Sequence, residues 1–239
     1  MQRCGIAEVS SALESEEVSL ILTLRESKDI EVTRLLDMAE ERGIRVRETS
    51  RNDMWRMSRV NYGEEPPPIL ALVGRDPDAG TGEILSSGGL CWLLDGARYP
   101  VNIGFTIRTA EVSGASAVFV DGKLSHAEKK AARRASMKAD RFMPVHWVDG
   151  FELVKMAKAA GFRIISLEDS GNLEPWDVDL SGNVILVVGG EHDGISKPIL
   201  DCSDSVIRVP MSGFVPSYNL QAPMAVVAAE SLRQRNSRI

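Results

Sequence analysis

Val184-Ile185-Leu186-Val187-Val188-Gly189-Gly190-Glu191-His192-Asp193-Gly194 is the stretch that decides the fold class of this 239-residue chain. Its first five residues are an apolar run typical of a buried parallel strand, and a glycine-rich loop follows directly. The run at 206–209 repeats this arrangement, with a loop over 210–220 and a predicted helix over 222–234. Both loops follow the carboxyl ends of predicted strands, where open α/β sheets bind their ligands. The C-terminal third therefore predicts a binding site between two loops.

Strand and helix patterns alternate through the second half of the chain. Apolar runs predict strands at 90–94, 117–120, 144–148, 164–167, 184–188 and 206–209. Helical spacing predicts helices over 102–113 and 127–135, and another that begins after Asp149 and ends at Gly161. This alternation predicts an α/β domain, with a parallel sheet and helices on both of its faces.

A smaller α/β unit is predicted before this domain. Residues 18–24, 44–46 and 69–73 have the apolar pattern of strands, and 31–42 has helical spacing followed by Gly43, a residue suited to end a helix. Glycine, proline and short polar residues accumulate between 75 and 89, which is typical of a linker. We therefore expect a domain over 1–74, a linker over 75–89 and a second domain over 90–239.

Composition argues against several classes of protein. No apolar run approaches the roughly 18 residues that span a membrane. The three cysteines are far apart in sequence, which disfavours a disulfide or zinc framework. A cytoplasmic protein without membrane contact or metal is the expectation. The net charge of −6 argues against indiscriminate binding to nucleic acid but allows a local basic surface.

Nucleotide binding is the first function that such a sheet suggests, and the sequence argues against it. No G-x-G-x-x-G follows the strand at 90–94, and no G-x-x-x-x-G-K-[ST] occurs. The loop over 189–194 has glycines at its ends, but its acidic centre would repel a pyrophosphate. His192 beside Glu191 could indicate a metal site or a base, although a lone loop histidine is usually neither.

The segment after the strand at 90–94 is more informative. It turns sharply and enters a predicted helix, on which Gly104 and Arg108 are four residues apart and share a face. One interpretation is that the glycine leaves room for a phosphodiester to approach the guanidinium. The alternative is a helix-packing glycine below a surface arginine. Spacing alone does not decide between them.

Three motifs occur in order along this domain. They are N-x-G-x-x-x-R-T-A from Asn102, V-V-G-G-E-x-x-G-I from Val187, and I-R-V-P-M-x-G-x-x-x-S-x-N-L from Ile207. Together they resemble the SpoU (TrmH-type) branch of the SPOUT RNA methyltransferases, over residues 90–235. Residues 1–74 more weakly resemble the ribosomal-protein-like domain that often precedes this catalytic domain and recruits its RNA substrate.

This resemblance implies a deep trefoil knot formed by the C-terminal segment, an exception to the rule against threaded chains. It also implies a homodimer that binds S-adenosylmethionine in the knot and methylates ribose 2′-hydroxyls of tRNA or rRNA. The backbone would supply most of the cofactor contacts, because amides and carbonyls can reach adenine and ribose directly. The implied cofactor-binding residues are Gly189, Gly190, Val209, Met211, Tyr218 and Leu220.

The resemblance places catalysis on Arg108, Asn102, Glu191, Ser217 and Asn219. Arg108 would hold a phosphate or stabilise charge, since free arginine is a poor base, and a contribution to proton removal stays open. Asn102 would orient Arg108 or the RNA, while the other three would fix the knot loops and the target ribose. Glu191 could instead cap the following turn, and Ser217 could be the N-cap of the last helix.

The sequence departs from the family pattern at four positions. Tyr99 stands where an aspartate is usual, and Tyr218 stands where a leucine is usual. Gln221 and Pro223 replace small residues at the start of the last helix. A tyrosine ring at 218 could alter the adenine pocket. These changes leave the methyltransferase prediction intact and bear on the preference for cofactor or substrate.

Two further patterns bear on partners. The last helix has apolar residues around most of its circumference, more than a one-sided surface helix needs, which predicts a homodimer. A basic cluster predicts a local RNA surface, unless it is merely a solvated helix face. Its members are Lys123, Lys129, Lys130, Arg133, Arg134, Lys138 and Arg141.

The competing function is a non-catalytic relative that binds RNA or assists its folding and keeps the knot without turnover. A protein that only binds RNA needs no set of catalytic residues. Because the five implied catalytic residues occur together, the sequence favours the enzyme.

Overall fold

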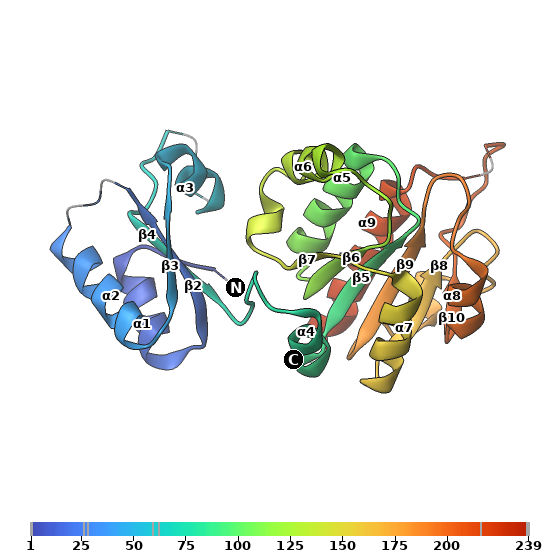
Figure 1. The fold of residues 1–239 in the computed structure, drawn as a ribbon, viewed down its shortest axis with the longest axis horizontal. Helices are drawn as coiled ribbons and strands as arrows, with labels where there is room; N and C mark the ends of the chain where they lie inside the picture. The colour runs from blue at the N-terminus through green and yellow to red at the C-terminus, as the bar shows by residue number, and fades with distance from the viewer. Residues whose placement is uncertain are drawn as a thin grey trace. The chain divides into compact units, whose positions relative to one another are not determined.

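The computed structural model describes residues 2–25, 27, 29–58, 60–61, 63–215 and 217–237. The chain divides after Asp76 into two compact units (Figure 1). Over the described residues, no helix is both long and apolar enough to cross a membrane.

The first unit is built on a mixed sheet. Its strands are β1 (Gln2–Cys4), β2 (Val18–Leu24), β3 (Arg45–Thr49) and β4 (Ile69–Val73), in the order β1-β4-β2-β3. β2 is parallel to β3 and antiparallel to β4. The helices are α1 (Ile6–Ser15), α2 (Ile30–Glu41) and α3 (Arg51–Met57). α1 and α2 pack their apolar faces on Ile21 of β2. The sequence pattern did not predict β1 or α1.

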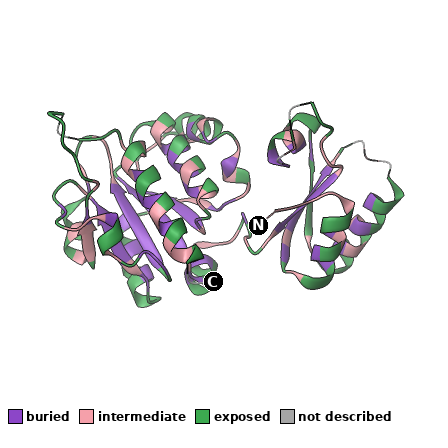
Figure 2. Ribbon diagram, turned by 180° about the vertical axis from the view of Figure 1, so that it is seen from behind, coloured by how far each residue is buried: buried purple, intermediate pink, exposed green. Residues whose placement is uncertain are grey.

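The second unit is built on a sheet in which each neighbouring pair of strands is parallel. Its strands are β5 (Leu90–Asp95), β6 (Ala117–Val120), β7 (Val145–Trp147), β8 (Arg163–Leu167), β9 (Val184–Gly189) and β10 (Ser205–Ile207), in the order β10-β8-β9-β5-β6-β7. The central strands are buried along nearly their whole length (Figure 2). The predicted parallel sheet is confirmed.

Alternate residues of β5 face opposite layers of helices. Trp92 and Leu94 pack with the layer of α5 (Pro100–Val112), α6 (His126–Ala135) and α9 (Gln221–Asn236). Cys91 and Leu93 pack with the layer of α4 (Thr81–Ser87), α7 (Gly150–Ala159) and α8 (Lys197–Cys202). Helices therefore cover both faces of the sheet, which confirms the predicted α/β class.

The segment 75–89, expected to be a linker, contains the helix α4 instead. Ile84 and Leu85 of this helix are buried against the sheet of the second unit. Gly80 is its N-cap residue, and the Glu83 side chain accepts a hydrogen bond from the Gly80 amide at 2.6 Å. Gly88 ends the helix with a φ of 76°. The glycines that suggested a linker are thus the two ends of a helix.

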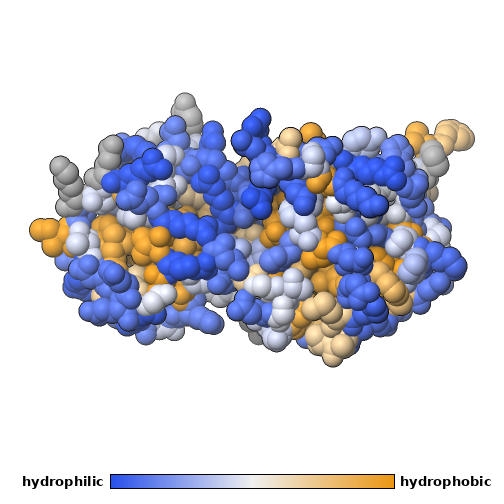
Figure 3. All heavy atoms as spheres, viewed as in Figure 1, coloured by the Kyte–Doolittle hydropathy of each residue, from blue (hydrophilic) through white to orange (hydrophobic). Residues whose placement is uncertain are grey.

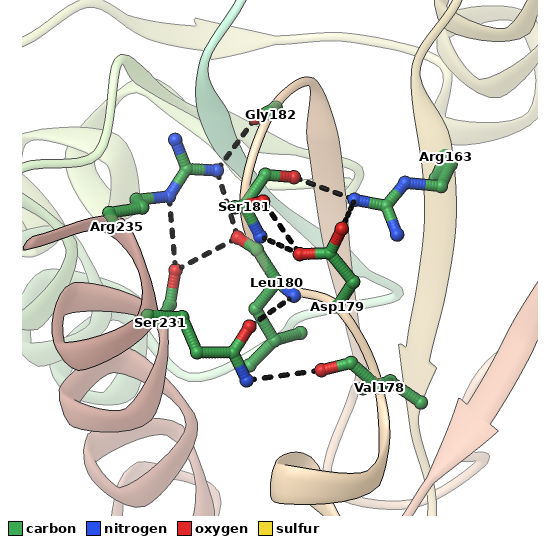
Figure 4. A network of polar contacts seen from close by, with 9 residues as sticks. Arg163, Val178, Asp179, Leu180, Ser181, Gly182, Ser231 and Arg235 are labelled. Atoms are coloured by element: carbon green, nitrogen blue, oxygen red, sulfur yellow. Dashed lines mark hydrogen bonds and ion pairs between the residues drawn. The ribbon is translucent and has the colours of Figure 1, made fainter. Parts of the chain in front are cut away.

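The C-terminal end of α9 is fastened to the loop that precedes β9 (Figure 4). Arg235 donates hydrogen bonds to the carbonyl oxygens of Leu180 at 3.0 Å and Gly182 at 2.7 Å. The Gln234 side chain accepts one from the Leu180 amide at 2.7 Å and donates one to the Val178 carbonyl at 3.1 Å. These bonds hold the helix at the amino ends of the strands, opposite to the loops that follow β9 and β10.

Candidate active site

A cavity of about 430 Å³ lies at the carboxyl ends of β8 and β9. The loops that follow β9 and β10 lie at this edge of the sheet (Figure 1), and the first turn of α5 and the start of α9 complete the wall. The lining residues are Asn102, Leu167, Glu168, Asp169, Val188, Gly189, Gly190, Glu191, His192, Gly194, Val209, Ser217, Tyr218, Asn219, Leu220 and Pro223.

Asn102 connects three segments of this cavity. It lies in the first turn of α5, which Pro100 begins. Its side-chain amide donates to Glu191 Oε1 in the loop after β9, and its Oδ1 accepts from Gln221 Nε2 at 3.1 Å at the start of α9. We expected Asn102 to orient Arg108 or the RNA, whereas its side chain orients Glu191. Gln221, which departs from the family pattern, thus helps to hold Asn102 in place.

Glu191 has one carboxylate oxygen in use and one unused. Oε1 accepts the hydrogen bond from Asn102, whereas Oε2 is buried and has no hydrogen-bond partner among the described residues. Leaving a buried acceptor unsatisfied costs free energy, and such groups are rare in folded proteins. The unused oxygen therefore indicates a place for a donor on a bound molecule. The alternative, in which Glu191 caps the following turn, is not what the structure shows.

The cavity is acidic. Its lining includes the carboxylates of Glu168, Asp169 and Glu191 and, within the described ranges, no lysine or arginine. Such a lining suits a ligand that has positive charge and disfavours a phosphate group. Glu168 Oε2 also accepts a hydrogen bond from the Ile195 amide at 3.0 Å, which holds the loop after β9. Sequence reasoning missed Glu168 and Asp169, although their position directly after β8 is the signal that could have found them.

Backbone packing explains the two glycines that follow the apolar run of β9. A Cβ atom at Gly189 would lie 2.2 Å from the carbonyl carbon of Gly194, and one at Gly190 would lie 2.3 Å from the carbonyl oxygen of Gly96. The Gly190 amide also donates to the Asp95 carbonyl at 2.7 Å. We expected these glycines to bring the backbone close to the cofactor. In the structure Gly189 lets the loop close on itself at Gly194, and Gly190 lets it pack against the residue after β5.

The loop after β10 supplies another wall. Val209, Tyr218 and Leu220 line the cavity, whereas Met211 lies outside the lining and is 37% exposed. The Tyr218 hydroxyl donates to the Pro210 carbonyl oxygen at 3.0 Å, so the tyrosine side chain spans the loop. The structure therefore separates Met211 from the other residues implied to bind the cofactor.

Ser217 and Asn219 both line the cavity. α9 begins at Gln221, and Asn219 Oδ1 accepts a hydrogen bond from the Gln221 amide at 3.2 Å. The N-cap position of α9 is Leu220, which makes no side-chain capping hydrogen bond. Ser217 is therefore not the N-cap, and the contact of Asn219 holds the residue just before the helix to its first turn. Ser217 is left as an exposed residue at the cavity.

Arg108 lies outside the cavity lining. It follows Asn102 by six residues, about 9 Å along the helix, and its exposed side chain makes no ion pair or hydrogen bond within the part of the chain that the structure describes. Gly104 faces α6, where a Cβ atom would lie 2.5 Å from both the Ala132 carbonyl oxygen and Ala135 Cβ. The packing interpretation of Gly104 is therefore correct, and the interpretation that it admits a phosphodiester is wrong.

Three side-chain pairs join the segment 98–102 to the loop after β9, and the two segments pair in antiparallel order. Beyond the contact between Asn102 and Glu191, the Tyr99 hydroxyl lies 2.9 Å from His192 Nε2. Further out, Arg98 forms an exposed ion pair with Asp193 at 2.5 Å. Sequence reasoning treated His192 as a lone loop histidine and missed its partner.

The basic cluster lies mostly on α6, whose surface is strongly hydrophilic (Figure 3). Ser125 caps this helix and forms a capping box with Glu128. Arg133 and Arg134 are exposed in its last turn, and the Lys129 ammonium lies 4.9 Å from the centre of the Trp147 ring. The cluster is thus an ordered surface at one face of the second unit.

The SpoU rRNA Methylase family model matches residues 89–229. The chain belongs to this family. The matched segment contains the whole parallel sheet and every residue that lines the cavity. The resemblance seen in the three sequence motifs is confirmed.

Relatives with named activities match nearly the whole chain. The 23S rRNA (guanosine-2′-O-)-methyltransferase RlmB of Xanthomonas axonopodis pv. citri is 27% identical over 237 residues, which cover 97% of this chain and 95% of the relative. An uncharacterized tRNA/rRNA methyltransferase of Mycolicibacterium smegmatis is 29% identical, and the match covers 92% of this chain and 71% of the relative.

Solved structures have the same fold. The SpoU methyltransferase AviRb from Streptomyces viridochromogenes, in complex with AdoMet, has a TM-score of 0.58 at 22% identity, over 99% of this chain and 91% of that one. The AdoMet-bound rRNA methyltransferase from Sinorhizobium meliloti has a TM-score of 0.60 at 21% identity, over 97% of this chain and 86% of that one.

Proposed function

We infer that this protein is an RNA methyltransferase that uses S-adenosylmethionine to methylate a ribose 2′-hydroxyl of rRNA or tRNA. Membership of the SpoU rRNA methylase family supports this function, as does the relative RlmB, which is named a 23S rRNA 2′-O-methyltransferase. One observation carries it further. Glu191 is held by Asn102 at an acidic cavity, and its buried Oε2 has no hydrogen-bond partner among the described residues, which supports a site that holds a small molecule.

S-adenosylmethionine suits this cavity in size and in charge. About 430 Å³ lies within the range of small-molecule sites. The cofactor has a sulfonium and an ammonium group, and three carboxylates line the cavity. Gly189, Gly190, Val209, Tyr218 and Leu220 would hold it, mainly through their backbone. The two AdoMet-bound neighbours support this assignment through their shared fold.

Alignment is the main task of the residues around the cavity. The bound cofactor supplies a methyl group that is electrophilic because it is attached to a sulfonium. Transfer to a hydroxyl depends on holding the two groups in line, and effective concentration provides much of the rate. Asn102 fixes Glu191, whose free Oε2 accepts a hydrogen bond from the ribose hydroxyl. Ser217 and Asn219 would fix the sugar at the same cavity.

A homodimer, in which Arg108 serves the cavity of the partner protomer, accounts for the position of this arginine. Val101, Phe105, Arg108 and Val112 occupy positions i, i+4, i+7 and i+11 of α5, so they form one stripe on its exposed side. α5 packs on α9, which has its own exposed apolar residues, including Val226. Exposed apolar faces of this kind are typical of protein interfaces. An arginine within such a face would be delivered to the partner.

The deep trefoil knot is proposed from the path of the chain. β10 pairs beyond β8 at one edge of the sheet, whereas α9 returns to pack on α5 beside the central strands. We propose that the chain between β10 and α9 passes through the loops at the carboxyl ends of the strands. A crystal structure traced through residues 160–236 would test the threading, and an unthreaded path would contradict it.

The first unit is proposed to recruit the RNA. Arg47 on β3 and Arg51 and Arg56 on α3 are exposed, and the match to RlmB extends over this unit as well as the second. Arginine is suited to phosphate contacts because its planar fork can donate two parallel hydrogen bonds.

Calorimetry with S-adenosylmethionine separates the enzyme from the non-catalytic alternative. The wild-type protein is expected to bind the cofactor. Glu191→Gln is expected to lose methyl transfer in a turnover assay, because the acceptor proposed for the ribose hydroxyl is removed. Trp176→Ala, an exposed aromatic outside the cavity lining, is the matched control. A wild-type protein that binds RNA but not S-adenosylmethionine would favour the RNA-binding alternative.

A further inference from the structure

The Tyr99–His192 pair lies between two other contacts that fasten the same two segments. Arg98 on one side and Asn102 on the other each bond to the loop after β9. These two flanking contacts already join the segments, and neither involves an aromatic ring. The pair between them adds two aromatic rings to this join, and the rings suggest a second role for the pair.

The geometry of the pair leaves ring faces open. The ring centroids of Tyr99 and His192 are 5.8 Å apart with planes inclined at 58°, and the contact between the hydroxyl and Nε2 uses atoms at the ring edges. Tyr99 is 47% exposed, and His192 is exposed and lines the cavity. The rings thus form a fixed aromatic surface at the rim.

The proposed positions of the cofactor and the ribose place the base of the target nucleotide at this rim. The cavity volume of about 430 Å³ suits one molecule the size of the cofactor. The target ribose must reach the free oxygen of Glu191, so its base lies one sugar away, outside the cavity. His192 is the next residue after Glu191 in the chain. Proteins hold unpaired RNA bases by stacking them on the rings of tyrosine, histidine and other aromatic residues.

We propose that His192 is the platform on which the base of the methylated nucleotide stacks, and that Tyr99 positions this ring. The proposal rests on the proposed 2′-O-methyltransferase function and adds how that site holds its nucleotide. Tyr99 replaces the aspartate that is usual in the family, so the platform belongs to this chain and to relatives that have the same pair.

Ring-preserving and ring-removing variants test the platform. His192→Ala, His192→Phe, Tyr99→Phe and the control Trp176→Ala are assayed with an unmethylated 23S rRNA transcript, for methyl transfer and, by filter binding, for affinity. His192→Ala is expected to raise the KM for RNA about 5- to 100-fold, the range typical of one stacked base. The Kd for S-adenosylmethionine should change less than about twofold, because the ring is not part of the cofactor cradle. His192→Phe keeps a ring at 192 but loses the contact with the Tyr99 hydroxyl, and Tyr99→Phe loses the same contact, so both should fall between wild type and His192→Ala.

Removing the base tests the same contact from the RNA side. With an abasic nucleotide at the mapped methylation position, wild type should lose affinity, whereas His192→Ala should lose little more. If His192→Phe and His192→Ala raise the KM for RNA equally and both weaken cofactor binding, the pair only holds the loop in place. That result would overturn the platform. An unchanged KM in His192→Ala would overturn it as well. If wild type binds the transcript without methylating it, the enzyme assignment fails, and the filter-binding comparison still decides whether the ring contacts RNA.

Discussion

Arg108 is the residue whose position says most about the reaction. It lies outside the cavity, exposed and without a partner among the described residues, so it is free to meet the RNA or a second protomer. We expect Arg108→Ala to lower the single-turnover rate of methyl transfer by about 100-fold or more, as for other groups that stabilise charge in the transition state. The cofactor Kd should stay near that of wild type, because this interaction is absent from the ground state.

Arg108→Lys keeps the charge but loses the planar fork, so it should restore little activity. Arg233→Ala removes an exposed arginine that pairs with Glu230 on α9, and it serves as the control for lost surface charge. Near-normal turnover in Arg108→Ala would refute the role given to this arginine.

At the residue scale, the motifs identified most of the cavity but not why each residue is there. Asn102, Glu191, Ser217 and Asn219 meet at one place, as their order in three motifs implied. The role of Gly104 could not be decided from its spacing to Arg108. Helical spacing shows which residues share a face, but it does not show which other helix packs on that face. Met211 belongs to a motif and yet lies outside the lining, because membership of a motif does not say which of its residues reach the cavity.

The end of α9 is the element-scale feature most open to measurement. Arg235→Ala leaves the Leu180 and Gly182 carbonyls without a charged donor, so we expect the free energy of unfolding to fall by about 1.5–3 kcal/mol. Arg233→Ala on the same helix removes a pair in which the arginine side chain is 63% exposed and that of Glu230 is 13% exposed, and it should cost less than Arg235→Ala, about 1 kcal/mol. Chemical denaturation measures both, and equal losses would show that the contacts of Arg235 are no stronger than a surface pair.

Helix α6 is expected to bind RNA phosphates. Arg133→Glu with Arg134→Glu should weaken binding to the rRNA transcript and reduce the salt dependence of the affinity by about two phosphate contacts. Arg47→Glu with Arg56→Glu, made in the first unit, tests the proposed recruitment surface in the same assay. If a double charge reversal changes neither the RNA affinity nor its dependence on salt, the surface that carries those two arginines is not part of the RNA site.

Strands with a continuous apolar run were predictable, whereas helices of less than two turns were missed. β2, β4 and β6 occupy the predicted residues, because buried strands require continuous apolar runs. α4 and α8 span only 7 and 6 residues, too few for a helical period to stand out from neighbouring glycine and proline. α4 was therefore hidden in a segment that had the composition of a linker.

At the scale of the whole molecule, the exposed faces of α5 and α9 predict a homodimer. Sedimentation at micromolar concentration should give twice the mass of one chain. Val226→Glu places a charge on the apolar face of α9 and should yield monomers. Met156→Glu, at an exposed apolar position on α7 in the opposite helix layer, is the matched control and should stay dimeric. A monomeric wild-type protein would contradict the dimer.

The dimer also predicts complementation between inactive subunits. Arg108→Ala and Asn102→Ala should each be inactive as homodimers. If Arg108 serves the partner's cavity, a co-expressed mixed dimer has one complete site and recovers part of the activity. Mixed dimers as inactive as the parents would place Arg108 at the cavity of its own protomer.

The central claim is methylation of a ribose 2′-hydroxyl, and alkaline hydrolysis of labelled RNA tests it most directly. Unmethylated rRNA and tRNA are incubated with the protein and S-adenosylmethionine tritiated in its methyl group, and the RNA is then digested with alkali. Alkali cleaves RNA through attack by the free 2′-hydroxyl, so a 2′-O-methyl group protects the adjoining phosphodiester. Label recovered in alkali-resistant dinucleotides is the predicted result. Label in mononucleotides, which indicates methylation of a base, or no label in either RNA, would contradict it.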